Sequence, residues 1–326
     1  MPSRLDMAIS ETPKARLKNS DPPRSHMVGR LHPSGLRITM EVNNYFLNNW
    51  PFPDERTKLQ FVAEGLPTWH LCQYPTARED RVGAACRFMV MLFLIDDLLE
   101  HLSLKEGSSY NERLISIVKG ETAPAQDSPI EKMVLKLWED MRSIDKKLSD
   151  DIEEPTFAFW RSQNDKDRLA KKSVAEYLKY RELDVASAVL LATQRFQDAT
   201  YLSEEELASV ADLELNYTHH ISVINDVMSW DKELRASKDI AAEGSIVSNI
   251  VQTLADESGL DYDGAKRICW VMIREWERQH DVIVQQKLQE GCSDALKTYM
   301  EGIELQMSGN ELWSRTTHRY NAPHLK

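Results

Sequence analysis

Apolar residues recur at spacings of three and four along most of the chain, which is typical of amphipathic α-helices. Alternating β-branched runs bounded by turn residues are hard to find, so no strand is predicted. The pattern therefore predicts an all-α fold. The expected helices cover residues 36–49, 55–65, 80–104, 129–147, 150–166, 173–196, 203–237 with a break near 215, 243–256, 261–289 and 292–307.

The longest apolar stretch runs from Val82 to Ile95 and carries Arg87 in its middle. It is too short to cross a bilayer, and no membrane span is expected. A helix that is apolar almost all round is buried in the core of its domain. We therefore expect this helix to lie at the centre of a helical bundle, with the acidic residues that begin at Asp96 at one mouth of the bundle.

The first 33 residues differ from the rest of the chain. They are polar, contain prolines and mix acidic with basic residues, without the apolar core of a signal peptide or the acid-free composition of a transit peptide. We expect residues 1–33 to form a disordered tail. Residues 34–326 show no clear linker and no internal repeat, so they are expected to form one helical domain.

Composition narrows the class of partners. The formal net charge of −12 argues against a nucleic-acid partner, because phosphate backbones are bound by clustered Lys and Arg. Four widely spaced cysteines form no C-x-x-C pair, which predicts neither a zinc site nor a disulfide framework and fits a reduced, cytoplasmic setting. Whether the protein is a monomer or a homo-oligomer is left open. The cysteines are Cys72, Cys86, Cys269 and Cys292.

Two polar segments interrupt this helical pattern, and their residue types indicate a binding site for a cation. Asn225, Ser229 and Glu233 are spaced by four residues, so on a helix their oxygen-bearing side chains share one face. Asp96 and Glu100 have the same spacing at the end of the apolar helix. Such hard oxygen ligands suit Mg²⁺, which usually completes its coordination with water and substrate phosphates. The two segments predict a magnesium site for a diphosphate substrate.

Each segment also has a simpler explanation. A D-D-x-x-E sequence is common at solvated helix ends of acidic proteins. The second segment is more specific, because Asn and Ser are mediocre helix formers in a helix interior and need another reason to be there. Their occurrence together on two apolar helices favours the metal site.

With these motifs the chain resembles class I terpene synthases, and most closely the fungal aristolochene synthases. The similarity covers about residue 40 to Tyr320 and includes the F-L-I-D-D-L-L-E segment that begins at Phe93, the N-D-x-x-S-x-x-K-E segment that begins at Asn225, and M-S-G-N-E-L-W at 307–313. The resemblance implies a single-domain class I terpenoid synthase bundle, with the active site at one mouth. It also implies farnesyl diphosphate as the substrate.

The resemblance assigns roles to individual residues. Three Mg²⁺ ions are implied, two of them bound by Asp96 and the third by Asn225, Ser229 and Glu233. Arg181 is implied to be the diphosphate-sensing arginine. The other residues implied to bind the diphosphate are Lys232, Arg319 and Tyr320. Guanidinium and ammonium groups, together with Mg²⁺, would stabilise the departing diphosphate.

The hydrocarbon part of the site is implied to be aromatic, because aromatic faces attract carbocations without reacting with them. Phe93, Phe159 and Trp313 match aromatic pocket positions of the resembling enzymes. The chain departs from them at two positions. Gln73 stands where they have a pocket tyrosine, and Ala186 stands where they have a glycine five residues after Arg181.

The function expected from the sequence is Mg²⁺-dependent ionisation and cyclisation of farnesyl diphosphate. In the resembling enzymes a germacrene-type intermediate leads to a bicyclic sesquiterpene hydrocarbon such as aristolochene. The alternatives are an isoprenyl diphosphate chain-elongating synthase, which normally has two aspartate-rich motifs, and a non-enzymatic helical adaptor. A di-iron bundle would need two E-x-x-H pairs. The pair Glu277 and His280 stands out, and it is expected on a helix surface.

Overall fold

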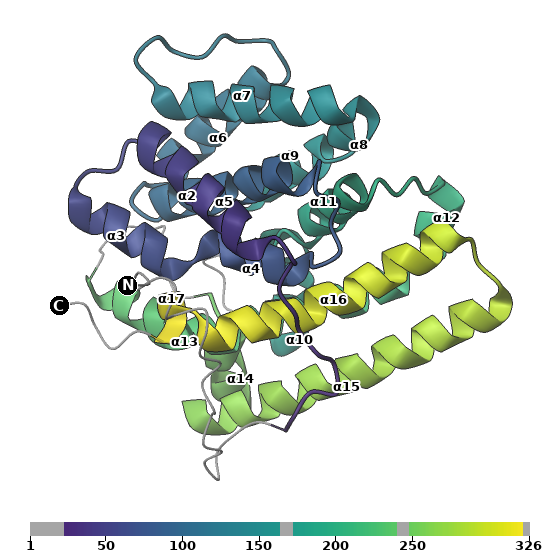
Figure 1. Ribbon diagram of the computed structural model, residues 1–326. Coiled ribbons are helices and arrows are strands. Elements are labelled where there is room, and N and C mark those ends of the chain that lie inside the picture. Colours follow the sequence, from purple (N-terminus) through teal and green to yellow (C-terminus); the bar gives the residue numbers. More distant parts are fainter. Residues whose placement is uncertain (1–22, 164–171, 240–247, 322–326) are drawn as a thin grey trace, which may run out of the picture.

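The computed structural model describes residues 23–163, 172–239 and 248–321, and its helices are labelled in Figure 1. No strand occurs in these three ranges, which confirms the all-α prediction. The first helices are α2 (Gly35–Asn49), α3 (Glu55–Glu64), α4 (Leu66–Gln73), α5 (Val82–Leu99), α6 (Leu104–Val118), α7 (Pro129–Ile144), α8 (Lys146–Asp150) and α9 (Glu153–Ser162). The remaining helices are α10 (Val174–Asp184), α11 (Ser187–Asp198), α12 (Glu204–Ala208), α13 (Ala211–Asp239), α14 (Ile250–Ser258), α15 (Tyr262–Glu290), α16 (Asp294–Thr316) and α17 (His318–Asn321).

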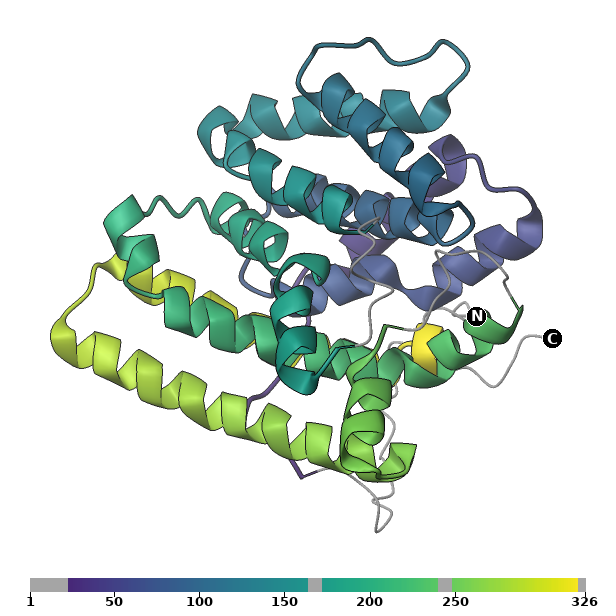
Figure 2. The same ribbon diagram turned by 180° about the vertical axis from the view of Figure 1, so that it is seen from behind.

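Helix α5 lies at the centre of the bundle, as its sequence predicts. It contacts α2, α4, α7 and α11, and nearly every side chain before Asp96 is buried. The two views show α6 and α7 at one end of the molecule and α15 at the other, with α13 and α16 between them (Figures 1 and 2). Among the described helices no segment is long and apolar enough to cross a membrane.

Three helices of the structure, α4, α6 and α17, were not predicted. Helix α4 contains Pro67, but this residue stands in the first turn, where a missing N–H costs no hydrogen bond. Helix α6 is polar on its outer side and contains Gly107, which weakened its apolar pattern. Its start does carry a sequence signal, since Ser103 and Glu106 form a capping box.

One predicted helix has an interruption that was not expected, and another is interrupted at a different residue than expected. The range 173–196 divides at Val185 and Ala186, and the break predicted near 215 is wrong, because the interruption lies before Ala211. The helix predicted at 243–256 begins at Ile250, and residues 240–247 lie outside the described ranges.

The last long helix runs past the predicted end at 307 to Thr316. Ser308, Gly309 and Asn310 are weak helix formers, which explains the short prediction. Packing requires the glycine, because a Cβ atom there would lie 2.0 Å from the carbonyl oxygen of Cys72. Helices α4 and α16 are therefore in direct backbone contact.

The predicted disordered tail is wrong for residues 23–33. Met27 is buried, and the buried ring of His32 bonds through Nε2 to the Ala77 carbonyl at 2.9 Å. Arg274 on α15 donates from Nε to the carbonyl of Pro23 at 2.7 Å. This segment thus packs against the helices, while residues 1–22 lie outside the described part of the chain.

Candidate active site

A cavity opens at the end of α5 where the apolar run gives way to acidic residues. All twelve residues predicted for the site line it. They come from segments that are far apart in the sequence, namely α4, α5, α9, α10, α13, α16 and α17. The lining residues are Gln73, Phe93, Asp96, Phe159, Arg181, Asn225, Ser229, Lys232, Glu233, Trp313, Arg319 and Tyr320.

The predicted oxygen ligands on α13 share one helix face, as their spacing requires. Ser229 donates a hydrogen bond to Glu233 one turn later. Asn249, the N-cap of α14, holds the other oxygen of Glu233 through its Nδ2 at 3.0 Å and also donates to the Asp226 carbonyl at 2.8 Å. A buried side chain from another helix therefore fixes the orientation of a predicted metal ligand.

The acidic end of α5 faces the same space. Carboxylate oxygens of Asp96, Asp97 and Glu100 lie within 4.8 Å of one another, close enough for one cation to bind them together. Gln163 at the end of α9 donates to Asp96 Oδ1 at 2.6 Å. The sequence indicated no role for Gln163, because only the fold brings α9 beside α5.

Two of the predicted diphosphate ligands are paired with carboxylates at this mouth. Arg319 donates to Asp97 Oδ1 and to Glu64 Oε2, each at 2.6 Å, and Lys232 Nζ lies 3.8 Å from Asp97. Burial acts to raise the pKa of Asp97, but Arg319 and Lys232 outweigh it and hold that pKa below its ordinary value. Asp97 is thus a charged partner that keeps Arg319 and Lys232 beside the cavity.

A second ion pair lies on the opposite side of the mouth. Arg181 donates from Nη2 to Asp226 Oδ1 at 2.9 Å and to Asn225 Oδ1 at 3.2 Å, and it also bonds to Asp184. Tyr177, one turn earlier on α10, donates to the other oxygen of Asp226 at 2.6 Å. Burial raises the pKa of Asp226 to about 6, although Arg181 opposes this.

Tyr320 joins the two sides of the mouth. Asn225 donates from Nδ2 to the Tyr320 hydroxyl at 3.0 Å, and burial raises the pKa of this tyrosine to about 12. Because a neutral phenol keeps its proton, Tyr320 can donate a hydrogen bond to an anion in the cavity.

The interruption between α10 and α11 lies on the cavity wall. Ala186 adopts the left-handed backbone conformation, with φ at 60°, and is one of two such non-glycine residues in the described ranges. This conformation strains a side chain that has a Cβ atom. The break thus forms without the glycine of the resembling enzymes, and it ends α10 at Asp184, the partner of Arg181.

Aromatic side chains line the cavity behind the charged mouth. The rings of Trp69 and Phe93 meet edge to face with centroids 4.7 Å apart, and Trp313 packs against Tyr320 at 5.5 Å. Phe159 lines the wall from α9. Trp69 was not among the predicted residues, because a tryptophan in a short helix cannot be told from ordinary core without knowing where it packs.

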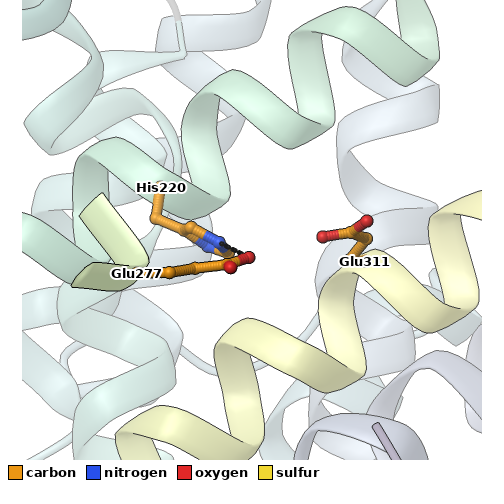
Figure 3. A group of neighbouring side chains, drawn as sticks. All are labelled: His220, Glu277 and Glu311. Atoms are coloured by element: carbon orange, nitrogen blue, oxygen red, sulfur yellow. Dashed lines mark ion pairs between the residues drawn. The ribbon is translucent and has the colours of Figure 1, made fainter. Parts of the chain in front are cut away.

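A second group of potential metal ligands lies away from the cavity. Figure 3 shows His220 and Glu277 facing each other from α13 and α15, with Glu311 of α16 opposite. The prediction that Glu277 and His280 decorate a helix surface is wrong, since each is 1% exposed. Arg274 bonds to Glu277 and donates to both oxygens of Glu311, at 2.6 and 2.7 Å. The two carboxylates already have a guanidinium as their cation, so this group is a structural ion pair.

Comparisons with known proteins agree with this geometry. The model of the family described as terpene synthase family 2, C-terminal metal binding, matches residues 87–279. The chain belongs to the terpene synthase family. The prediction from sequence motifs is thereby confirmed, and the non-enzymatic adaptor is excluded. The family description also supports the binding of a metal ion by this terpene synthase.

Relatives of this terpene synthase cover most of its length. A (+)-aristolochene synthase of Penicillium expansum is 45% identical over 89% of this chain and 88% of its own. An aristolochene synthase of Aspergillus terreus is 43% identical over 92% of this chain and 94% of its own. The crystal structure of aristolochene synthase from Penicillium roqueforti matches with a TM-score of 0.82 and 41% identity, over 91% of this chain and all of that one. The predicted class I terpene synthase fold is confirmed.

Proposed function

We propose that this terpene synthase is a sesquiterpene cyclase that converts farnesyl diphosphate, with Mg²⁺, into a bicyclic hydrocarbon and free diphosphate. One observation carries the proposal. The acidic end of α5 and the oxygen-bearing face of α13 border the same mouth of a cavity whose wall behind them is aromatic. The relatives at 43% and 45% identity, which are aristolochene synthases, support this substrate and an eremophilane such as aristolochene as the product.

The side chains at the mouth fit Mg²⁺. They offer carboxylate, amide and hydroxyl oxygens with no sulfur or imidazole among them, which is the ligand set of a hard divalent cation. Asp96 would hold two ions, and Asn225, Ser229 and Glu233 would hold a third. When bound, the metal neutralises the negative charge of the diphosphate leaving group.

The basic residues would exchange partners when the substrate binds. Arg319 is held by Asp97 and Glu64, and Arg181 by Asp226 and Asp184. A diphosphate in the mouth offers these guanidinium groups phosphate oxygens in bidentate geometry. The charge that develops on the leaving group is then stabilised by donors that are already in place. A diphosphate-bound structure in which Arg181 or Arg319 pointed into solvent would contradict this role.

The aromatic wall would protect the cation that forms. Phe93, Phe159 and Trp313 present ring faces and edges instead of nucleophiles, and cation–π attraction stabilises a positive charge beside them. Closing a ten-membered ring and then a second ring requires the chain to be held folded in a cavity from which bulk water is excluded. A germacrene-type intermediate would be reprotonated there before the final deprotonation.

The test is incubation of the purified protein with farnesyl diphosphate and Mg²⁺, followed by measurement of diphosphate release and gas chromatography of the hydrocarbons. We expect a bicyclic sesquiterpene as the main product. Parallel incubations with geranyl and geranylgeranyl diphosphate test the chain length. Isopentenyl diphosphate is added in a further arm, and formation of a longer prenyl diphosphate there would favour the chain-elongating synthase instead.

A further inference from the structure

The wall of the cavity carries two amide side chains besides the charged residues of the mouth. Gln73, at the end of α4, and Asn310, on α16, both line it together with the apolar side chains of Met89 and Leu190. The backbones that carry the two amides are in contact, because a Cβ atom on Gly309, the residue before Asn310, would lie 2.8 Å from the backbone nitrogen of Gln73. Farnesyl diphosphate is a hydrocarbon beyond its diphosphate group, so the substrate offers these amides no polar partner.

The position of the amides follows from the helices that carry them. On α5, Met89 precedes Asp96 by seven residues, which places it about 10 Å deeper along the helix axis. On α16, Asn310 lies one turn before Trp313, on the side away from Arg319 at the mouth. Gln73 and Asn310 therefore lie at the deep end of the cavity, where the distal end of the farnesyl chain would lie.

Both amides are buried with unpaired polar atoms. Gln73 is 1% exposed, and its Oε1 has no hydrogen-bond partner among the described residues. Asn310 is 7% exposed and accepts a hydrogen bond from Trp69 Nε1 through Oδ1, at 3.3 Å, while its Nδ2 has no partner in the same ranges. Because the indole N–H can only donate, Trp69 fixes the orientation of this amide. The deep end thus has an unpaired acceptor and an unpaired donor.

Buried polar groups of this kind are usually satisfied by protein or by ordered water, and a water molecule needs two or more polar partners. We propose that Gln73 and Asn310 hold one water molecule at the deep end of the cavity and that this water captures a carbocation, so that the enzyme releases a sesquiterpene alcohol beside its hydrocarbon. This inference rests on the proposed function, because it requires the enzyme to ionise farnesyl diphosphate.

The chemistry balances without a further reagent. Ionisation breaks the bond between C1 and the diphosphate oxygen, and attack by the distal double bond forms the C1–C10 bond and leaves a tertiary cation on C11. A lone pair of the water forms the C11–O bond, and the oxonium loses a proton to Gln73 Oε1, which passes it to solvent water when the product leaves. Gln73 Oε1 accepts one O–H of the water and Asn310 Nδ2 donates to one lone pair, which directs the other lone pair to the cation.

The test uses the full-length enzyme with farnesyl diphosphate and Mg²⁺ in H₂¹⁸O, with mass spectrometry of the products. We expect a tertiary sesquiterpene alcohol that contains one ¹⁸O atom. Gln73→Met keeps the side-chain length and removes the acceptor, and Asn310→Leu removes the donor. Each variant should lower the fraction of alcohol among the products at least tenfold. Gln285→Leu, an exposed amide on α15, is the matched control and should leave the fraction unchanged.

The two proposals fail in different ways. Without diphosphate release from farnesyl diphosphate, the proposed function is wrong. Normal diphosphate release with hydrocarbon alone overturns the water site and leaves the proposed function standing. The water site is also overturned if the alcohol persists at the same fraction in Gln73→Met, because water from elsewhere must then have captured the cation. Circular dichroism and thermal denaturation of each variant show whether it is folded, so a loss of alcohol is distinguished from a loss of structure.

Discussion

Carboxylates lie close together both at the mouth of the cavity and in the buried group formed by His220, Glu277 and Glu311. The hydrogen-bond partners of these carboxylates differ between the two regions. In the buried group, Arg274 lies between the two carboxylates and Arg315 also donates to Glu311, at 2.7 Å. At the mouth, Asp96 and Glu233 accept hydrogen bonds from the neutral amides of Gln163 and Asn249, and both carboxylates border an open cavity.

The difference shows that proximity of ligand atoms is not enough for a metal site. Burial acts to raise the pKa of Glu311, but Arg274 outweighs it and holds that pKa below its ordinary value. That carboxylate is charged and already paired. A metal ion would have to displace a guanidinium that joins α15, α16 and the segment at Pro23, whereas at the mouth it would enter a space beside the predicted oxygen ligands on α5 and α13. The side chains already bonded to a carboxylate therefore decide whether it can serve a metal.

Removal of metal should have the largest effect. A chelator should abolish turnover of farnesyl diphosphate, and Mg²⁺ should restore it. The ion pairs of the buried group need no metal and should be unaffected. Glu233→Gln should lower the rate by about 10² to 10³, as removal of one group that stabilises a developing anion does. Asp231→Asn is the matched control, since this carboxylate is on the same helix but 65% exposed. Activity in the presence of chelator would show that the mouth is not a metal site.

Breaking the buried group should affect stability instead of activity. Arg274→Met leaves two buried carboxylates without their cation, and removal of one partner from a buried ion pair costs about 3–5 kcal/mol. Urea denaturation of the apo-protein measures this loss, and the Mg²⁺ concentration needed for half-maximal activity should not change. Arg278→Met, one turn further on α15 and 64% exposed, should change the free energy of unfolding by less than about 0.5 kcal/mol. Equal losses in both variants would show that the buried pair is not what stabilises this region.

Asp198 shows what burial does to a carboxylate when no cation compensates it. Burial raises its pKa from 3.8 to about 7, although a hydrogen bond from Gln194 opposes this. A raised pKa in the folded state means that the carboxyl favours folding in its protonated form. This contribution is complete below pH 4 and is lost as the pH rises to 7, at about 1.4 kcal/mol per pH unit.

Asp198→Asn removes this titration, so the wild type should lose stability relative to the variant between pH 4 and pH 7 and then run parallel to it. Denaturation curves at several pH values measure the difference. Asp212→Asn, an exposed carboxylate at the start of α13, is the control. A pH-independent difference between wild type and Asp198→Asn would contradict the raised pKa.

The sequence could predict that Asn225, Ser229 and Glu233 share one face of α13, because this arrangement is local. Asn225 and Ser229 reach the same side of one helix through its periodicity alone. Asn249 and Gln163 could not be predicted, since their roles depend on which helix ends meet. Glu277 was predicted to be exposed for the same reason, because a polar position in a helical pattern does not reveal that Arg274 pairs with it.

The backbone break at Ala186 had no sequence signal of its own. Alanine favours the helix interior, so the left-handed conformation here is imposed by the surrounding packing. The central helix was predictable to within a few residues, because the long run between Arg81 and Asp96 is apolar on almost all sides and must be covered by other helices on those sides. Its position at the centre could be predicted from its composition, whereas the identity of the helices that pack against it could not.

The smallest effect is expected for the aromatic wall, and it separates the two parts of the site. Trp313 donates from Nε1 to the Gly65 carbonyl at 3.1 Å and packs against Tyr320, so its indole N–H bonds to the backbone and not to the predicted oxygen ligands on α13. Ionisation depends on the metal and the basic residues, so Trp313→Leu should leave diphosphate release within about tenfold of the wild type. Loss of a cation–π attraction of about 1–2 kcal/mol should instead release more of the early germacrene-type product. Measuring diphosphate and hydrocarbons in the same reaction separates the two effects, and an unchanged hydrocarbon profile would show that the wall does not steer the cation.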